Sequence, residues 1–435
     1  MALEEAVKSG ATQASAEVSD DAGLNISVRD AEAEVIEHTH DRSLSVTVYI
    51  GQRTGRASSG DLSPQAIERT VRAALDIAKY TSEDDCAGLP DPKHLCREPR
   101  DLSLYHPWDI DTDGAIKICQ EIEKAAFAYD SKIINSDGVN LNTSVGHFVL
   151  GNSEGFLAGY PYSNHYLYGG FIAENSDGMQ RDYGYTTNVD ARKLRSPEEI
   201  GKEAAKRAVD RLSPHSLSPR NCPVIFESRI AGHLIQAVAS AVSGGRQYRK
   251  ASFLQDALGK SVLNEDFSIF EDPFVPACYG SDPFDEEGVC GSPRFIVESG
   301  KLCGYFLGTY TAKKLGMETT GNAGGPYNLY LQCRPAAFEK DLPGLLKCMG
   351  TGLLVTELAG EGMNLTTGDY SRGCSGFWVE NGVIAYPVDG ITVAGNLKDI
   401  LFNMTATAGD INHEGSVFTG SILIDRMTVA GNGGQ

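Results

Sequence analysis

The sequence predicts an α+β fold of two domains, an N-terminal mixed α/β domain over residues 1–220 and a C-terminal, mainly β domain over residues 221–435. At 435 residues, the chain is too long for one ordinary hydrophobic core. Prolines and serines cluster in Ser213–Asn221, between an expected helix and an apolar strand, which is typical of a domain boundary. Beyond Phe267, strand patterns punctuated by glycine outnumber helical patterns.

The N-terminal half combines strand and helix signals. Short alternating runs between residues 16 and 59 predict strands of an antiparallel sheet. Ser63 followed by proline predicts the N-terminus of a helix, and a second helix is expected from about Asp113. Strands rich in glycine and tyrosine are expected over residues 133–188. A capping box that begins at Ser196 then predicts a third helix.

The C-terminal half opens with the stretch Cys222–Leu254, around which the rest of the chain is organised. An apolar run at residues 223–226 predicts a buried strand. Apolar residues then recur every four positions up to Val242, which predicts a helix packed on one face and ended by Gly244. Further strands are expected at 294–297, 352–357, 376–379, 391–394 and 421–424, and short helices at 310–315 and 396–404.

Charge and composition exclude several classes of protein. The net charge of -20 argues against binding to nucleic acid and to anionic membranes. No run of about eighteen apolar residues predicts a membrane span, and Glu4 and Glu5 stand where a secretory signal would be basic. Ten cysteines lie between Cys86 and Cys374 without a C-x-x-C pair, which favours reduced, packed thiols. We therefore expect a cytoplasmic protein.

The helix expected after residue 227 offers few metal ligands. His233 has Arg229 four residues before it and Ala237 four residues after it, so no second ligand lies one turn away. We interpret His233 as a packed or surface histidine. His38 and His40 share one face of a predicted strand and could bind a metal, but without a third ligand nearby we interpret that face as exposed.

Three other motifs have a chemical and a structural interpretation. The glycine-rich residues 321–325 lack the Lys-Ser/Thr ending of a phosphate-binding loop and predict a tight turn. The acidic residues 282–288 lack the ligand spacing of a calcium loop and predict a solvated loop. His413 and Glu414 are the best remaining metal candidate.

Polar residues and glycines precede an aromatic strand in Gly368–Trp378. This segment either places backbone donors against a peptide or forms an Ω-loop held by an Asp369–Arg372 pair. Cys374, within it, is a nucleophile only if a histidine lies near it in space. The substrate-binding candidates are Asp369, Tyr370, Arg372 and Trp378.

Several long segments together resemble one protein family over nearly the whole chain. They are residues 61–67, 73–78, 248–254, 283–285, 319–325, 368–381 and 391–397. In these segments the sequence resembles the TldD/PmbA family of metallopeptidases, and specifically its TldE (PmbA) branch.

In the TldD branch, the resemblance implies a zinc site on an H-E-x-x-x-H helix and a later cysteine. Anchored on Arg249 and Lys250, the three helix positions fall on Ile235, Gln236 and Ser240. Isoleucine cannot bind zinc and glutamine cannot act as a general base, and moving the register by one residue restores no ligand. No cysteine follows Cys374.

The resemblance therefore implies a TldE-type subunit of a peptide-cleaving complex, associated with microcin maturation and antitoxin degradation. It implies no catalytic residue, metal or cofactor in this chain, zinc in a TldD-like partner, and no catalysis by this chain alone. Two alternatives stay open. The chain could be an autonomous metallopeptidase with other ligands, such as His413 and Glu414, or a homodimeric peptide-binding protein.

Overall fold

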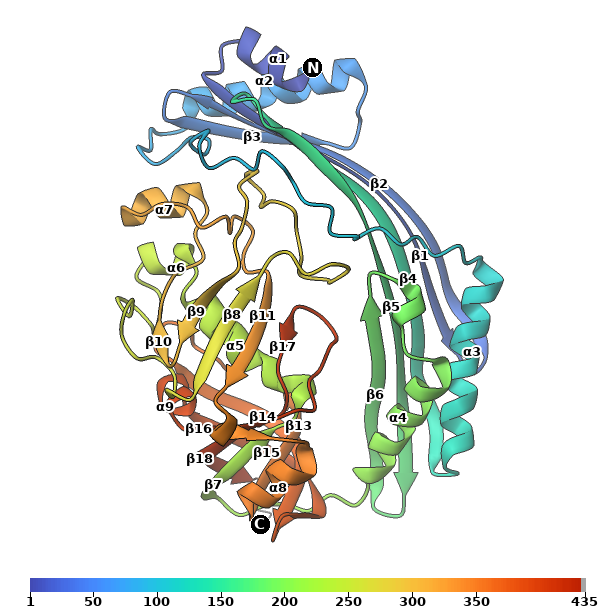
Figure 1. Ribbon diagram of the computed structural model, residues 1–435. Helices are drawn as coiled ribbons and strands as arrows, with labels where there is room; N and C mark the ends of the chain where they lie inside the picture. The colour runs from blue at the N-terminus through green and yellow to red at the C-terminus, as the bar shows by residue number, and fades with distance from the viewer. Residues whose placement is uncertain (432–435) are drawn as a thin grey trace.

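The computed structural model describes residues 1–431, and its fold is α+β, as predicted. The first half forms a long, curved sheet, and the second half forms two smaller sheets that lie inside the curve (Figure 1). The two halves meet along one face of the curved sheet. The domain boundary expected at residues 213–221 lies between the last helix of the first half and the first strand of the second.

The curved sheet has six antiparallel strands in the order β3-β2-β1-β4-β5-β6. Its strands are β1 (Gln13–Arg29), β2 (Glu32–Ile50), β3 (Arg53–Ser59), β4 (Ile133–Asn152), β5 (Leu157–Asn175) and β6 (Gly178–Asn188). β4 has 20 residues and β5 has 19, more than three times the usual length of about five to six residues, so they reach from one end of the molecule to the other (Figure 1).

Helices cover one face of this sheet and its N-terminal end. They are α1 (Ala2–Lys8), α2 (Pro64–Tyr80), α3 (Thr112–Tyr129) and α4 (Pro197–Asp210). The sequence predicted three of their starts correctly, at α2, α3 and α4. The Ser63 hydroxyl caps α2, and the Ser196–Glu199 capping box is formed at α4. Odd-numbered residues of β5, such as Leu167 and Phe171, face α3 and α4 in the core.

The larger sheet of the second half closes into a ring. β7 (Arg220–Phe226) pairs with both β13 and β18, so β7, β13, β14, β15 and β18 surround a common interior. The other bounds are β12 (Phe338–Glu339), β13 (Gly352–Ala359), β14 (Asp369–Glu380), β15 (Val383–Asn396), β16 (Met404–Ala408) and β18 (Ile422–Gly431).

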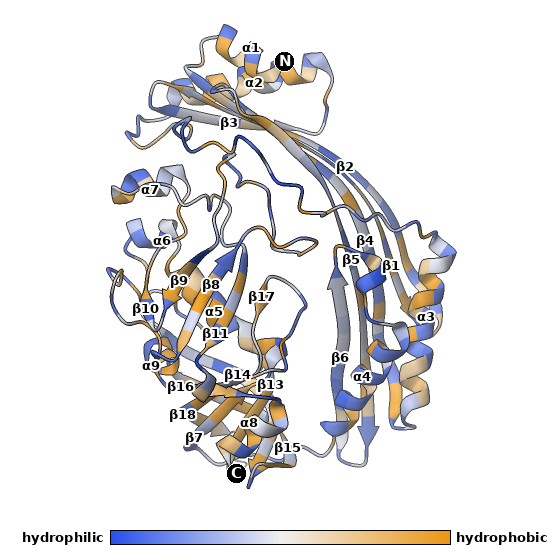
Figure 2. Cartoon of the chain, viewed as in Figure 1, coloured by the Kyte–Doolittle hydropathy of each residue, from blue (hydrophilic) through white to orange (hydrophobic). Residues whose placement is uncertain are grey.

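A five-stranded sheet in the order β10-β9-β8-β11-β17 faces the ring across helix α5 (Ser228–Ala241). Its strands are β8 (Phe267–Asp272), β9 (Arg294–Glu298), β10 (Lys301–Leu302), β11 (Asn328–Cys333) and β17 (Val417–Phe418). One hydrophobic core joins α5 to both sheets, where Figure 2 shows apolar residues concentrated. The remaining helices are α6 (Gly244–Tyr248), α7 (Thr309–Leu315), α8 (Leu342–Met349) and α9 (Leu397–Phe402).

The interpretation of Gly368–Trp378 as an Ω-loop is wrong. These residues belong mostly to β14, which pairs with β13 on one side and β15 on the other. Because side chains alternate along a strand, Asp369 and Arg372 point to opposite faces and cannot pair. Asp369 instead accepts a hydrogen bond from Thr367, and Arg372 donates one to the Gly360 carbonyl.

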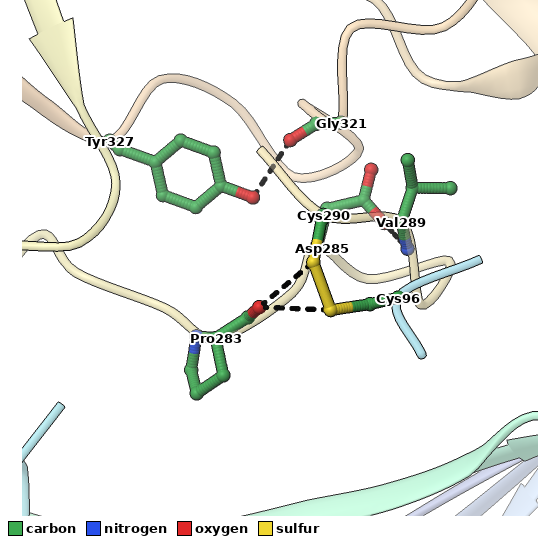
Figure 3. The surroundings of a disulfide bond; sticks show 7 residues. All are labelled: Cys96, Pro283, Asp285, Val289, Cys290, Gly321 and Tyr327. Atoms are coloured by element: carbon green, nitrogen blue, oxygen red, sulfur yellow. Dashed lines mark hydrogen bonds between the residues drawn. A yellow bond between two sulfur atoms is a disulfide. The ribbon is translucent and has the colours of Figure 1, made fainter. Parts of the chain in front are cut away.

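The expectation of reduced cysteines is wrong for Cys96 and Cys290, which form a disulfide (Figure 3). Both sulfur atoms lie near the carbonyl oxygen of Pro283, at 3.6 and 3.8 Å. The bond ties the segment before α3 to the acidic segment of the second half. The other eight cysteines are free thiols, and a cytoplasmic location stays a prediction.

No helix in the described part of the chain is both long and apolar enough to cross a membrane.

Replacing Gly376 with alanine should destabilise the ring of strands. An added Cβ would lie 1.9 Å from the Leu354 carbonyl oxygen on the neighbouring strand. We expect the free energy of unfolding to fall by about 2 kcal/mol or more. Gly373→Ala, on the same strand, is the matched control, because its Cβ would meet only Ala359, at 3.5 Å or more. Equal denaturant midpoints for the two variants would contradict this account of the packing.

Candidate functional site

Helix α5 presents two polar residues to a cavity of about 720 Å³. Gln236 and Ser240, one helical turn apart, are exposed on the cavity wall. Ile235 is fully buried in the core between the two sheets. Much of the remaining wall comes from residues 243–246 and 322–327. Of the three helix positions singled out by sequence, two therefore face a cavity and one does not.

The side chains at these positions do not fit a zinc site. Zinc in proteins is bound by cysteine thiolates, histidine nitrogens or carboxylates, whereas Gln236 and Ser240 supply an amide and a hydroxyl. Across residues 1–431, no group of three or more His, Cys, Asp or Glu side chains is arranged to hold a metal ion.

His233 is a packed residue of α5. Its Nδ1 lies 2.6 Å from the Ile230 carbonyl oxygen, so Nδ1 carries the proton and donates it. Its Nε2 then accepts a hydrogen bond from the Tyr370 hydroxyl at 2.9 Å. Burial lowers the pKa of His233 to about 4. The imidazole is therefore neutral at physiological pH, with both nitrogens engaged.

The glycine-rich residues 321–325 form a rigid turn beside the cavity. The Asn322 amide donates to Glu271 at 2.8 Å and accepts from Arg294 at 2.9 Å. Glu271 and Arg294 are themselves a buried ion pair at 3.0 Å. The Tyr327 hydroxyl donates to the Gly321 carbonyl at 2.7 Å (Figure 3). Gly321 has a φ of 68°, which glycine adopts without strain.

The acidic segment 282–288 is not the solvated loop that the sequence predicted. Asp285 is only 4% exposed and accepts hydrogen bonds from the backbone N–H groups of Glu287, Val289 and Ala323 at 2.8 to 2.9 Å. Burial raises the pKa of Asp285 to about 7, although these bonds oppose the shift. Phe284, the residue before Asp285, packs into an aromatic cluster and so holds the segment against the protein interior.

A second cavity, of about 520 Å³, separates this acidic segment from the curved sheet. Residues 323–327 line it and also line the first cavity. On its wall, the Tyr160 hydroxyl of β5 donates a hydrogen bond to Asp282 at 2.8 Å. Burial raises the pKa of Asp282 to about 6. The glycine-rich turn is thus the wall shared by two cavities.

The histidines proposed as metal candidates lie apart from both cavities. The Glu414 carboxylate accepts a hydrogen bond from the Thr187 N–H, and burial raises its pKa. The His413 ring packs near Phe418, with ring centroids 6.2 Å apart. His38 and His40 lie on an exposed face of β2, as predicted, and His40 contacts Asp20 at 2.7 Å.

The substrate-binding candidates on β14 are distributed over both faces of the strand. Tyr370 and Trp378 are buried, at 1% and 5% exposure, whereas Asp369 is exposed and Arg372 is half-buried. None of the four lines either cavity described above. Burial raises the pKa of the Cys374 thiol to about 12, so the nucleophilic thiolate is scarce at neutral pH.

Sequence reasoning missed the ionic cluster that joins the two halves. Asp182 on β6, at 4% exposure, contacts Arg207 at 3.2 Å and Arg211 at 3.4 Å, both at the end of α4. Arg207 also binds Glu227, before α5, through two hydrogen bonds of 2.6 and 2.9 Å. The helical spacing of the two arginines was visible in the sequence, but their carboxylate partners lie on other elements.

Comparisons with known proteins give the family. Models of the PmbA/TldA metallopeptidase family match three parts of the chain, with domain 1 at residues 14–78, the central domain at 105–212 and the C-terminal domain at 219–431. A Haemophilus influenzae protein named metalloprotease PmbA homolog is 48% identical over 431 residues, which cover 99% of this chain and 95% of that protein.

Metalloprotease PmbA of Escherichia coli O157:H7 is 44% identical over 436 residues and is matched over 96% of its length, with 99% of this chain covered. The crystal structure of TldE from Thermococcus kodakarensis has the same fold, with a TM-score of 0.86 at 20% identity, and the match covers 99% of this chain and all of that one. The chain therefore belongs to the PmbA/TldA metallopeptidase family, in its TldE (PmbA) branch.

Proposed function

We propose that this chain is the TldE-type subunit of a TldD/TldE metallopeptidase complex that cleaves peptides, and that zinc resides in the TldD-like partner. The proposal includes the roles that the resemblance implies, in maturing peptide microcins and degrading antitoxins. In it, this chain shapes the space that holds the peptide and supplies no catalytic group.

The observation that supports the proposal is the chemistry of the side chains that α5 exposes to the first cavity. Gln236 and Ser240 occupy an i, i+4 pair, which is the spacing at which two side chains on one helix can share a ligand. Neither residue is a zinc ligand type, and an amide cannot take up a proton as a general base. In this proposal, the α5 face of the cavity supplies neither a zinc ligand nor a general base.

The edge strand β17 gives the cavity a means to hold a peptide. Val417 lies on β17, at the edge of the five-stranded sheet, and also lines the first cavity. Within residues 1–431, β17 pairs only with β11, through two residues. An extended peptide can pair with the free backbone groups of such an edge while its side chains enter a neighbouring cavity.

The purified chain should contain far less than one zinc ion per molecule. The reason is the lack of ligand-type side chains at Ile235, Gln236 and Ser240. Elemental analysis of protein made without a metal-binding tag measures this directly. One zinc per chain that disappears in a His413→Ala variant would reject the proposal and favour an autonomous metallopeptidase.

Mixing the chain with a TldD-like subunit from the same genome should produce peptidase activity that neither subunit shows alone. In this pair, Gln236→Ala should leave the cleavage rate within a few-fold of normal, because the amide takes no part in the chemistry. Gly321→Ala should lower the rate by about a hundredfold, because its Cβ would meet the Cys290 carbonyl at 2.5 Å and displace the turn that shapes both cavities.

Gly316→Ala is the matched control for the turn variant. Gly316 has a nearly equal φ of 66° but open space around it, so the substitution adds backbone strain without a clash. A steady-state assay with a fluorogenic peptide, with the zinc content of the partner verified, measures all three variants. Loss of activity in Gln236→Ala together with normal activity in Gly321→Ala would reverse the roles proposed here.

A further inference from the structure

The Cys96–Cys290 bond joins two segments from different halves of the chain. Cys96 lies in the long connection between α2 and α3, residues 81–111, which contains no helix and no named strand. Cys290 follows the acidic segment 282–288 of the second half. Figure 3 shows the bond close to Gly321 of the glycine-rich turn. This pair of cysteines has no part in the function proposed so far.

The other cysteines indicate that the bond is not a permanent cross-link. Eight cysteines are free thiols, and two of these, Cys303 and Cys348, are exposed. Proteins of oxidising compartments usually hold their cysteines in disulfides, whereas a disulfide in a reducing compartment is usually transient. Exposed free thiols beside one bonded pair are therefore typical of surroundings in which that bond can open and close.

One of the two bonded residues is accessible to small reagents. Cys290 is exposed, whereas Cys96 is 5% exposed and packs with Phe156 and Phe284 in an apolar cluster. A small thiol or a small disulfide can therefore reach Cys290. Cys96 is then the resolving cysteine, which a small reagent does not need to reach.

Backbone contacts keep the two cysteines close to each other when the bond is open. The Cys96 N–H donates to the Gly288 carbonyl at 2.8 Å, and Leu95 forms an antiparallel bridge with Val289. Neither contact depends on the bond between the sulfur atoms. The two thiols therefore stay within reach of each other after reduction, and the bond can form again.

Cys290 also supports the wall that the first two cavities share. Its backbone lies directly against Gly321, where an added Cβ would meet the Cys290 carbonyl oxygen at 2.5 Å. The preceding residue, Val289, donates its N–H to the Asp285 carboxylate at 2.8 Å, and the same carboxylate accepts the Ala323 N–H at 2.9 Å. A bond that restrains Cys290 therefore restrains the glycine-rich turn at both of these contacts.

We propose that Cys96 and Cys290 form a redox switch that sets the rigidity of the glycine-rich turn, residues 321–325. With the bond closed, the connection before α3 is covalently joined to the segment on which the turn rests. With the bond open, the turn keeps its hydrogen bonds but loses this restraint. Residues 323–325 line both cavities, so the switch acts on the wall of each. The inference goes beyond the proposed function, in which the turn has one fixed state.

Closing the bond needs an oxidant, and a small disulfide such as oxidised glutathione supplies it. The Cys290 thiolate attacks one sulfur of the small disulfide, forms a mixed disulfide and releases one small thiolate. The Cys96 thiolate then attacks the Cys290 sulfur and releases the second. Two protein thiols and one small disulfide thus become one protein disulfide and two small thiols, which take up the two protons. An excess of the small thiol drives the same steps backwards.

The first measurement is the state of the pair in the full-length, folded chain. The protein is equilibrated with mixtures of reduced and oxidised glutathione, free thiols are blocked with a maleimide, and the linked peptide is quantified by mass spectrometry. We expect a mostly closed bond in excess oxidised glutathione and a mostly open bond in excess reduced glutathione, reached from either direction. A bond that stays closed in millimolar reduced glutathione, or one that never forms, would overturn the inference.

The second measurement is amide hydrogen exchange in residues 284–291 and 320–325, with the bond open and closed. We expect roughly fivefold slower exchange with the bond closed, because exchange requires a local opening that the bond opposes. Peptides from β14, which lies outside the linked segments, are the internal reference. Equal exchange of the turn in the two states would show that the bond does not control it.

Cys96→Ser should abolish the effect of glutathione on exchange in the turn, and Cys86→Ser should retain it. Cys86 is a half-buried free thiol in the same connection, so it controls for the loss of one thiol. Cys290→Ser is the second variant, because serine at an exposed position disturbs little packing. A turn that still responds to glutathione in a folded Cys96→Ser or Cys290→Ser variant would overturn the inference. None of these measurements needs a peptide, a partner or zinc, so they are independent of the peptidase assay.

Discussion

The arrangement of the two halves depends on Asp182, a carboxylate buried on the edge strand of the curved sheet. A carboxylate at 4% exposure is costly to desolvate unless cations and donors surround it. Arg207 and Arg211 provide that surrounding, one helical turn apart on α4. Removing both arginines would strip this buried carboxylate of its two nearest cations, and breaking a buried ion pair in this way costs about 3–5 kcal/mol.

The same two arginines orient the second half. Arg207 reaches Glu227, the residue before α5, and Arg211 reaches Glu357 on β13 and Ser375 on β14. Because Glu227 is engaged by Arg207, its side chain does not cap α5. These contacts anchor the start of α5 to the first half, while the rest of the helix packs in the core between the two smaller sheets. The second cavity lies between the two halves, whereas the first is lined by residues of the second half alone.

The sequence predicted those features that local patterns determine. Ser63 and Ser196 cap helices because the residues that they bond lie within the next turn. The face of α5 that carries Gln236 followed from a helical repeat of apolar residues. By contrast, α8 was missed because a proline and a glycine near its start resemble a turn, although Asp341 caps the helix.

The remaining errors involve contacts between residues far apart in sequence. Cys96 and Cys290 are separated by 194 residues, so no spacing pattern could pair them. Asp285 lies in an acidic segment whose composition predicts a solvated loop. It is nevertheless buried, because it accepts a hydrogen bond from the Ala323 N–H and because its neighbour Phe284 packs into an aromatic cluster. The glycines before Trp378 suggested a loop, but Gly376 permits two strands to approach closely.

The case for zinc in a partner does not depend on the register chosen along α5. Anchoring on Arg249 and Lys250 places one ligand position at Ile235, whose side chain points into the core. The cavity-facing pair is instead Gln236 and Ser240. In either register the α5 side chains that reach the cavity are uncharged and lack an imidazole or a thiolate. The Asn322 turn and the Glu271–Arg294 pair fix the shape of the cavity, and a fixed shape is what the proposed substrate-holding role requires.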